Sequence, residues 1–306
     1  MAKAINKLKR RAAKNDPVVW TPLEESRLLT YLRRNDVDST ALKKLFPKRT
    51  WPSIRSKVRK LRIQYDLFGS SYRSTKENFT VQIAKATKAK VVFDAYAGAG
   101  HQAFKWIQYA DAVYASEIVK KKIKQFDKSA IGNGFKKLKP KGNWQVYMKG
   151  VKRIYLFMGD ALEAIVELKT AAVAIDLVDL DTCGSTLPLL PTVLLLLRPR
   201  HLVITHGEFH SMRFNREDVL RRLFVHRDIS ENPLPLEVEE MSDELDKAVK
   251  LTALRSHNDT ARSFWLVLRR EKWLGSRFHG MLRRYYKVKK PPATADCINE
   301  LSRPYA

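Results

Sequence analysis

The stretch of sequence that decides the fold is Lys90-Val-Val-Phe-Asp-Ala-Tyr-Ala-Gly-Ala-Gly100. Its apolar residues 91–93 predict a short buried strand that ends at Asp94, and residues 101–109 show a helical pattern. Between them lies a turn of small residues, which includes Ala97, Gly98 and Gly100. Small residues at a strand–helix junction let the backbone approach a ligand closely, and the helix N-terminus presents free N–H groups. The stretch therefore predicts an α/β domain with a ligand-binding turn.

Two further predicted strands end at acidic residues. The strand at residues 112–116 ends before Glu117, about 20 residues past the glycine turn, where an acid can accept both hydroxyls of a ribose. The strand at residues 154–158 is followed by Asp160, which is placed to meet an adenine amino group. Together with Asp94, these acids predict a nucleotide-sized site.

A fourth predicted strand covers residues 171–181 and is apolar enough to be buried on both faces, as a central parallel strand is. Carboxylates are costly in such a strand. We therefore expect its three acids to cluster toward the carboxyl end, where open α/β sheets bind their ligands: Asp176, Asp179 and Asp181.

The turn also separates two kinds of nucleotide-binding fold. A dinucleotide-binding fold has G-x-G-x-x-G directly after the strand, whereas here Asp94 comes first and A-x-A-G-A-G follows. This arrangement, with the acids in this order, resembles the class I S-adenosylmethionine-dependent methyltransferases over roughly residues 78–270. The resemblance implies a Rossmann-like, mostly parallel sheet and S-adenosylmethionine as the cofactor. It also implies the cofactor-binding residues: Asp94, Ala97, Gly98 and Gly100 at the methionine part, Glu117 at the ribose and Asp160 at the adenine.

The segment after the fourth strand is similar to D-x-I-D-L-D-P-F-G-S-P of the tRNA guanine N2-dimethyltransferases. Here it reads Asp176-Leu-Val-Asp-Leu-Asp-Thr-Cys-Gly-Ser-Thr186, with Thr182 in place of the proline and Cys183 in place of the aromatic residue. The resemblance implies methylation of an exocyclic base amine, held by Asp181 and a backbone carbonyl near Thr182. The expected catalytic residues are Asp181, Thr182 and Cys183.

Other functions stay open for this segment. Cytosine-C5 methyltransferases use a cysteine as nucleophile, which would give Cys183 a covalent role. A non-catalytic DNA-binding regulator with a degenerate methyltransferase fold also accommodates the altered Thr182-Cys183 pair. His206, at the end of a fifth predicted strand, either binds a base, moves a proton or is structural.

Residues 17–69 have a separate pattern of three helices. Thr21, followed by Pro22 and two glutamates, is a helix start, and Asp38 and Thr50 cap two further helical patterns. The third helix, over residues 51–62, has apolar residues on one side and cations on the other. This pattern predicts a small three-helix domain.

Two motifs in this unit resemble the Myb/SANT-type helix-turn-helix repeat. They are Trp20-Thr-Pro-x-Glu-Glu and Arg49-Thr-Trp-x-x-Ile-x-x-Lys57. In that family the third helix reads the major groove, which implies that nucleic acid is contacted by Arg55, Lys57, Arg59 and Lys60. SANT-like repeats also bind proteins, so a protein-interaction or structural role is the alternative.

The charge of the chain favours a polyanionic partner. Its 306 residues contain 58 Lys+Arg and 32 Asp+Glu, a net charge of +26. Basic residues alternate with aromatic ones over residues 269–287, a pattern that suits a strand of nucleic acid, and we expect Arg283 and Arg284 to contact its phosphates. The predicted partner is therefore nucleic acid, DNA or RNA. The alternative is a ribosome-associated or merely very soluble basic protein.

Other features limit the class of protein. Its two cysteines are far apart, which excludes a disulfide framework and a thiolate zinc cluster, and no spacing predicts a catalytic metal. The N-terminus has no secretory pattern, and the longest apolar run, residues 187–197, is shorter than the ~20 residues that span a bilayer. We expect a soluble intracellular protein.

These patterns divide the chain into five segments. They are a basic flexible arm at residues 1–16, the helix-turn-helix at 17–69, a linker at 70–77, the α/β methyltransferase domain at 78–288 and a loose tail at 289–306.

Overall fold

The computed structural model describes residues 19–34, 37–65, 73–182, 184–209, 238–256, 263–274 and 281–290. The chain divides into two compact units, Met1–Ser74 and Thr75–Ala306. The predicted arm at residues 1–16 and the predicted tail from residue 291 onward lie outside the described residues.

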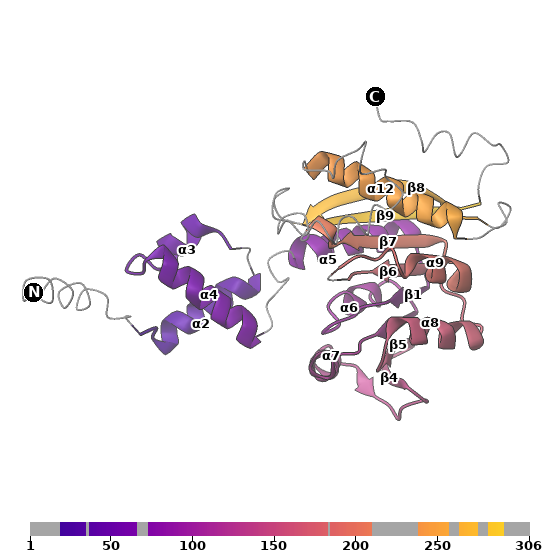
Figure 1. Cartoon of the computed structure of the whole chain (residues 1–306). Coiled ribbons are helices and arrows are strands. Elements are labelled where there is room, and N and C mark those ends of the chain that lie inside the picture. The colour runs from indigo at the N-terminus through magenta and orange to yellow at the C-terminus, as the bar shows by residue number, and fades with distance from the viewer. Residues whose placement is uncertain are drawn as a thin grey trace, which may run out of the picture. The chain divides into compact units, whose positions relative to one another are not determined.

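The first unit contains three described helices around one core (Figure 1). They are α2 (Pro22–Arg34), α3 (Ser39–Leu45) and α4 (Trp51–Tyr65). The Asp38 carboxylate caps α3 by accepting from the Thr40 N–H at 2.7 Å. The buried side chains of the core come from all three helices: Leu28, Leu32, Leu42, Ile54, Val58 and Leu61. The helices therefore start where the capping residues predicted them.

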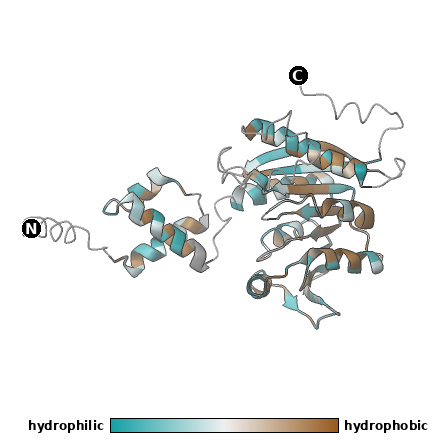
Figure 2. Cartoon of the chain, viewed as in Figure 1, coloured by the Kyte–Doolittle hydropathy of each residue, from teal (hydrophilic) through white to brown (hydrophobic). Residues whose placement is uncertain are grey.

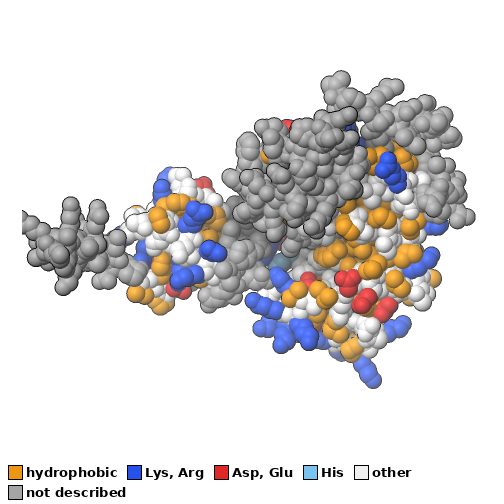
Figure 3. All heavy atoms as spheres, viewed as in Figure 1, with side chains coloured by type: hydrophobic (Ala, Val, Ile, Leu, Met, Phe, Trp, Pro, Cys, Tyr) orange, Lys and Arg blue, Asp and Glu red, His pale blue; other side chains and the backbone are white. Residues whose placement is uncertain are grey.

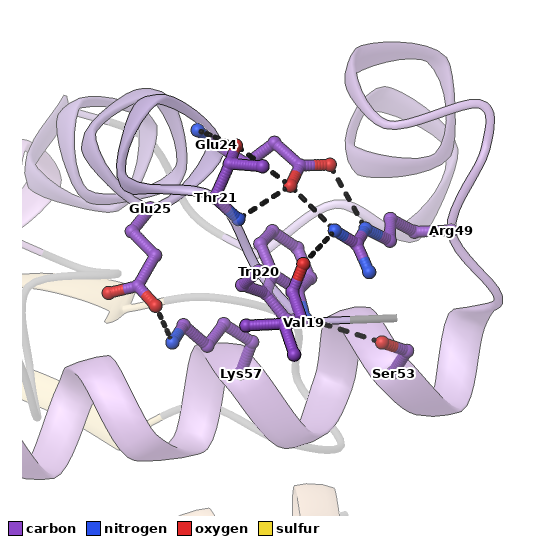
Figure 4. A network of polar contacts seen from close by, with 8 residues as sticks. All are labelled: Val19, Trp20, Thr21, Glu24, Glu25, Arg49, Ser53 and Lys57. Atoms are coloured by element: carbon purple, nitrogen blue, oxygen red, sulfur yellow. Dashed lines mark hydrogen bonds and ion pairs between the residues drawn. The ribbon is translucent and has the colours of Figure 1, made fainter. Parts of the chain in front are cut away.

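A polar network fixes the start of α2 against α4 (Figure 4). Thr21 and Glu24 form a capping box, because Glu24 accepts from the Thr21 N–H at 2.9 Å and Thr21 Oγ1 accepts from the Glu24 N–H at 3.2 Å. Hydrogen bonds from Arg49 lower the pKa of Glu24 to about 2. The Arg49 guanidinium also lies 4.9 Å from the centre of the Trp20 ring. The residues of the two motifs therefore hold the start of α2 against α4.

The second unit is built on a nine-stranded sheet (Figure 1). Its strand order is β3-β4-β5-β2-β1-β6-β7-β9-β8. The five strands from β5 to β7 pair in parallel, and the outer pairings are antiparallel. The bounds are β1 Val91–Asp94, β2 Ala112–Ser116, β3 Lys136–Lys137, β4 Trp144–Lys149, β5 Lys152–Phe157, β6 Leu177–Leu180, β7 His201–His206, β8 Trp265–Leu274 and β9 Met281–Lys289.

Helices cover both faces of this sheet, and its central strands are hydrophobic (Figures 1 and 2). One face carries α5 (Arg73–Thr87), α6 (Ala103–Trp106) and α7 (Lys120–Gly132). The other carries α8 (Ala161–Thr170), α9 (Leu190–Thr192), the π-helix Val193–Leu197 and α12 (Val238–Arg255). This arrangement confirms the predicted α/β fold with a mostly parallel central sheet.

Several predicted bounds were wrong. The helix predicted over 101–109 is only α6, and the long strand predicted over 171–181 is only β6. The predicted linker 70–77 overlaps α5, which begins at Arg73. Among the described helices, none combines the length and the apolar character that crossing a membrane requires.

Candidate active site

The carboxyl ends of the five parallel strands bring the predicted acidic residues to one edge. In spatial order, the residues at or just after these ends are Asp160, Glu117, Asp94, Asp181 and His206. Asp94 is the register partner of Ala115 on β2 and of Asp179 on β6. From β1 the chain continues to β2 and β5 on one side, and from β5 it crosses to β6 on the other side of β1. β1 and β6 therefore flank the topological switch point, where open α/β sheets bind ligands.

The glycine turn after β1 is held by backbone hydrogen bonds. Ala97 N–H donates to the Ser116 carbonyl at 3.0 Å, and Ala95 N–H donates to the Asp179 carbonyl at 3.0 Å. Gly98 has φ +57° and no atom within 4 Å of the position that a Cβ would take. The backbone at Gly98 is therefore open to a ligand. Gly100 has φ +88°, and its Cβ position lies 2.5 Å from the Phe104 ring.

We expect the two glycines to respond differently to alanine. Gly100→Ala should lower the free energy of unfolding by about 3 kcal/mol, because the methyl group collides with packed rings in a left-handed backbone. Gly98→Ala should cost about 1 kcal/mol, from backbone strain alone. Urea unfolding of both variants measures the difference, and equal losses would contradict this description of the turn.

Glu117 and Asp160 each use one carboxylate oxygen locally. Glu117 Oε1 accepts from the Val119 N–H at 2.7 Å, and Asp160 Oδ1 caps α8 by accepting from the Leu162 N–H at 2.7 Å. Among the described residues, neither second oxygen has a hydrogen-bond donor. These oxygens are therefore available to hydroxyl or amino groups of a ligand.

Large apolar side chains are exposed beside these two acids. The exposed fractions are 37% for Tyr96, 63% for Ile118, 46% for Met158 and 46% for Leu162. Burial raises the pKa of Tyr96, and the charge of Asp160 raises it further. None of these four residues was predicted from the sequence. The available signal was that Ile118 directly follows Glu117 and that Met158 precedes Asp160 by two positions.

A network of buried polar groups lies beneath this edge, on the face that α5 covers. The fully buried Arg283 guanidinium donates to Asp179 Oδ2 at 2.6 Å, to Thr205 Oγ1 at 2.6 Å and to Thr80 Oγ1 at 3.2 Å. Trp106 Nε1 also donates to Asp179 Oδ2, at 2.8 Å. Asp179 is therefore a structural partner of Arg283, with no exposed surface for a ligand.

Asp94 is a buried acid whose carboxylate has no hydrogen-bond partner in the described part of the chain. Its side chain is 1% exposed, and neither carboxylate oxygen has a hydrogen-bond partner among the described residues. Burial raises the pKa of Asp94 well above its ordinary value, and the charges of Asp179 and Asp181 raise it further. Burial among these carboxylates therefore favours the protonated form of Asp94.

We expect Asp94→Asn to stabilise the protein increasingly as the pH rises. The unfolded carboxyl ionises above its ordinary pKa while the folded one stays protonated, so wild-type stability falls with rising pH through that range. Asparagine removes this loss because it stays neutral. The difference in melting temperature between variant and wild type should be larger at pH 8 than at pH 5. A difference that does not change with pH would show that Asp94 is ionised in the folded protein.

Asp181 lies beside Asp94 and is held in the ionised form. Its carboxylate pairs with the Lys76 amine on α5, and both side chains are 15% exposed. Burial alone would raise the pKa of Asp181, but the charges of Lys76 and Arg283 and hydrogen bonds from Lys76 and Thr205 together lower it. The Thr182 hydroxyl donates to the Gly184 carbonyl at 2.5 Å. Cys183 lies outside the described residues, so its predicted roles stay predictions.

His206 and Glu208 form a buried polar pair at the next strand end. His206 Nδ1 lies 3.5 Å from Glu208 Oε2, and both side chains are almost completely buried. Within the described part of the chain, neither ring nitrogen of His206 and neither carboxylate oxygen of Glu208 has a hydrogen-bond partner. Buried polar groups without hydrogen bonds are costly, so this pair lowers the stability of the described structure.

Other predicted site residues lie elsewhere. Asp176 was expected near the carboxyl edge, but its Oδ2 accepts from the Lys90 N–H at 2.9 Å at the opposite edge, because β6 begins only at Leu177. Arg283 and Arg284 were expected to contact nucleic acid, and that expectation was wrong. Both are buried, and Arg284 pairs with Glu271 and with Ser242 of α12.

Three of the four cations of α4 that were predicted to contact nucleic acid have exposed side chains. Arg55, Arg59 and Lys60 are exposed, opposite the buried face of the helix. Lys57 instead pairs with Glu25, so its charge is partly neutralised (Figure 4). In the described residues, no group of His, Cys, Asp and Glu is arranged to hold a metal ion.

Comparisons with known proteins now locate the fold. No family model and no curated protein matches this chain. The structure is similar to Trm1 from Pyrococcus horikoshii in complex with S-adenosyl-L-methionine, with a TM-score of 0.56 and 16% identity over 71% of this chain and 56% of that one. Trm5b from Pyrococcus abyssi has a TM-score of 0.40 and 11% identity over 71% and 49% of the two chains. The tRNA m1G37 methyltransferase from M. jannaschii has a TM-score of 0.40 and 13% identity over 70% and 49%.

The likeness to Trm1 establishes the fold of the second unit. This unit has the α/β architecture of that solved structure, with the candidate site at the carboxyl ends of its parallel strands. The chain spans 56% of the length of Trm1. Function must therefore be argued from the residues at the site.

Proposed function

We propose that this protein is an S-adenosylmethionine-dependent methyltransferase that acts on an exocyclic base amine of nucleic acid. The observation that carries the proposal is the convergence of Asp160, Glu117, Asp94 and Asp181 along one strand edge, around a glycine turn that is open to a ligand. The fold shared with Trm1 supports it.

The residues at this edge fit S-adenosylmethionine. Gly98 leaves open space beside the turn, where a Cβ would intrude on the methionine part. Glu117 offers a carboxylate oxygen to ribose hydroxyls, and Asp160 offers one to an adenine amino group. Tyr96, Ile118, Met158 and Leu162 supply apolar surface for a flat ring. When bound, this group supplies an electrophilic methyl on a sulfonium.

The adjacent strand end supplies the amine-binding group. Asp181 is ionised and fixed by Lys76, so its carboxylate is a preorganised acceptor for an N–H of the target amine. A ring-attached amine has a delocalised lone pair and is a weak nucleophile. Positioning by Asp181, with a backbone carbonyl near Thr182, would therefore provide much of the rate.

The first unit binds nucleic acid in this proposal. The exposed cations of α4, Arg55, Arg59 and Lys60, face away from the core of a three-helix unit that resembles a Myb/SANT repeat. Changing all three to glutamine should reduce the slope of log K against log salt by about 0.7–0.9 for each phosphate that α4 no longer neutralises. An unchanged slope would mean that α4 does not touch the polymer.

Labelled S-adenosylmethionine, incubated with the protein and separately with total RNA and total DNA, tests the proposed function. Label in an N-methylated nucleoside, identified by nucleoside analysis, is the expected result. Label in 5-methylcytosine that disappears in Cys183→Ala would instead support covalent catalysis. No label in either polymer would contradict the enzyme and favour a non-catalytic nucleic-acid-binding regulator.

A further inference from the structure

A lysine-rich surface lies outside the site described above, on α7 and the β3–β4 hairpin. Residues 120–141 contain nine lysines and one acidic residue, Asp127. Figure 3 shows Lys and Arg side chains gathered over α7. Six exposed lysines define what we call the lysine surface: Lys120, Lys121, Lys124, Lys128, Lys136 and Lys139.

The helix and the hairpin form one continuous surface. The buried side of α7 packs into the core through Phe126 and Ala130, which leaves Lys120, Lys124 and Lys128, four residues apart, on the opposite side. Asp127 joins the two elements, because it accepts from Lys137 on β3 at 2.9 Å and also from the hydroxyl of Tyr147 on β4. The lysines of β3 therefore continue the row on α7.

Within residues 120–141, Asp127 is the one acid that could balance the charge of the lysine surface. Its single acid is already occupied by Lys137 and Tyr147. The lysines of α12 are different, because Lys247 pairs with Glu244 and Lys250 pairs with Asp246. Like charges four residues apart on a helix destabilise it. A partner that carries regularly spaced negative charge would relieve this repulsion.

The position of the lysine surface relates it to the candidate active site. α7 begins at Lys120, three residues after Glu117, so the row of lysines starts beside the carboxyl edge of the sheet. We propose that the lysine surface binds the phosphate backbone of a nucleic acid and holds it across this edge. The choice of nucleic acid as the polyanion rests on the proposed function. Lysines act as point charges, so the interaction sets position and not sequence preference.

Two triple variants with the same change in net charge test this proposal. The surface variant is Lys120→Gln, Lys124→Gln and Lys128→Gln. The control changes three exposed lysines that lie near the ends of α5 and α8, just before the amino ends of β1 and β6. The changes are Lys85→Gln, Lys88→Gln and Lys169→Gln. Affinity for a tRNA mixture and for duplex DNA is measured over a range of KCl concentrations, without cofactor, after thermal unfolding has shown that both variants fold.

The surface variant should bind its preferred polymer roughly 10- to 100-fold more weakly at low salt, with the salt slope reduced by about 0.7–0.9 for each phosphate that is no longer neutralised. The control should bind as wild type does. Equal losses in both variants would overturn the proposal, since only net charge would matter. Binding of wild type and the surface variant to phosphatidylserine vesicles is measured as well. If the surface variant loses vesicle binding but keeps nucleic-acid binding, the proposal is also overturned. Because the assay contains no cofactor, a failure of methyl transfer leaves its outcome unaffected.

Discussion

Replacing Arg283 with methionine is expected to lower the free energy of unfolding by about 3–5 kcal/mol. The Arg283 guanidinium is fully buried and is the cation that neutralises the fully buried Asp179. Its loss leaves that carboxylate with Trp106 as its remaining hydrogen-bond donor among the described residues. Chemical denaturation of the ligand-free protein measures the change.

Arg284→Met is the matched control on the other face of the same strand. Arg284 is also buried, but its partner Glu271 has a side chain that is 46% exposed and can be rehydrated. The loss of stability in Arg284→Met should therefore be clearly smaller than in Arg283→Met. If Arg283→Met unfolds as wild type does, the buried network under the site does not exist as described.

Replacing Asp181 with asparagine is expected to reduce methyl transfer on the order of 10²-fold or more, with affinity for S-adenosylmethionine retained. The carboxylate is the fixed acceptor for the target amine in the proposed function, and the amide would also face the Lys76 amine. Single-turnover rates and calorimetric affinities separate the two effects.

Asp246→Asn is the control for the loss of a buried ion pair. Asp246 pairs with Lys250 at 2.6 Å, and its side chain is 7% exposed. Both variants should lose stability, and only Asp181→Asn should lose methyl transfer. Equal activity in the two variants would show that Asp181 does not bind the amine.

The strand edge could be predicted from the sequence because its signals are local. Each feature can be recognised from a few consecutive residues: the strand at Val91–Asp94, the glycine turn, and the acids after the neighbouring strands. Parallel strands carry their carboxyl ends to one edge, so Asp94, Glu117 and Asp160 had to converge once the strands were assigned.

The buried network could not be predicted because it joins residues far apart in sequence. Lys76 pairs with Asp181, which is 105 residues further along the chain. Arg283 donates to Thr80 and Asp179, which precede it by 203 and 104 residues. The basic and aromatic residues near Arg283 were predicted to contact a strand of nucleic acid. They form β9, which lies between β7 and β8 and is therefore paired along both edges. An arginine is stable there only because distant carboxylates neutralise it.

Isothermal titration calorimetry with S-adenosylmethionine and with its demethylated product, on the purified ligand-free protein, measures the central claim most directly. Saturable heat with both compounds is the predicted result, together with weaker binding in Glu117→Gln, whose amide accepts less strongly from ribose hydroxyls. Absence of heat with either compound would contradict the account.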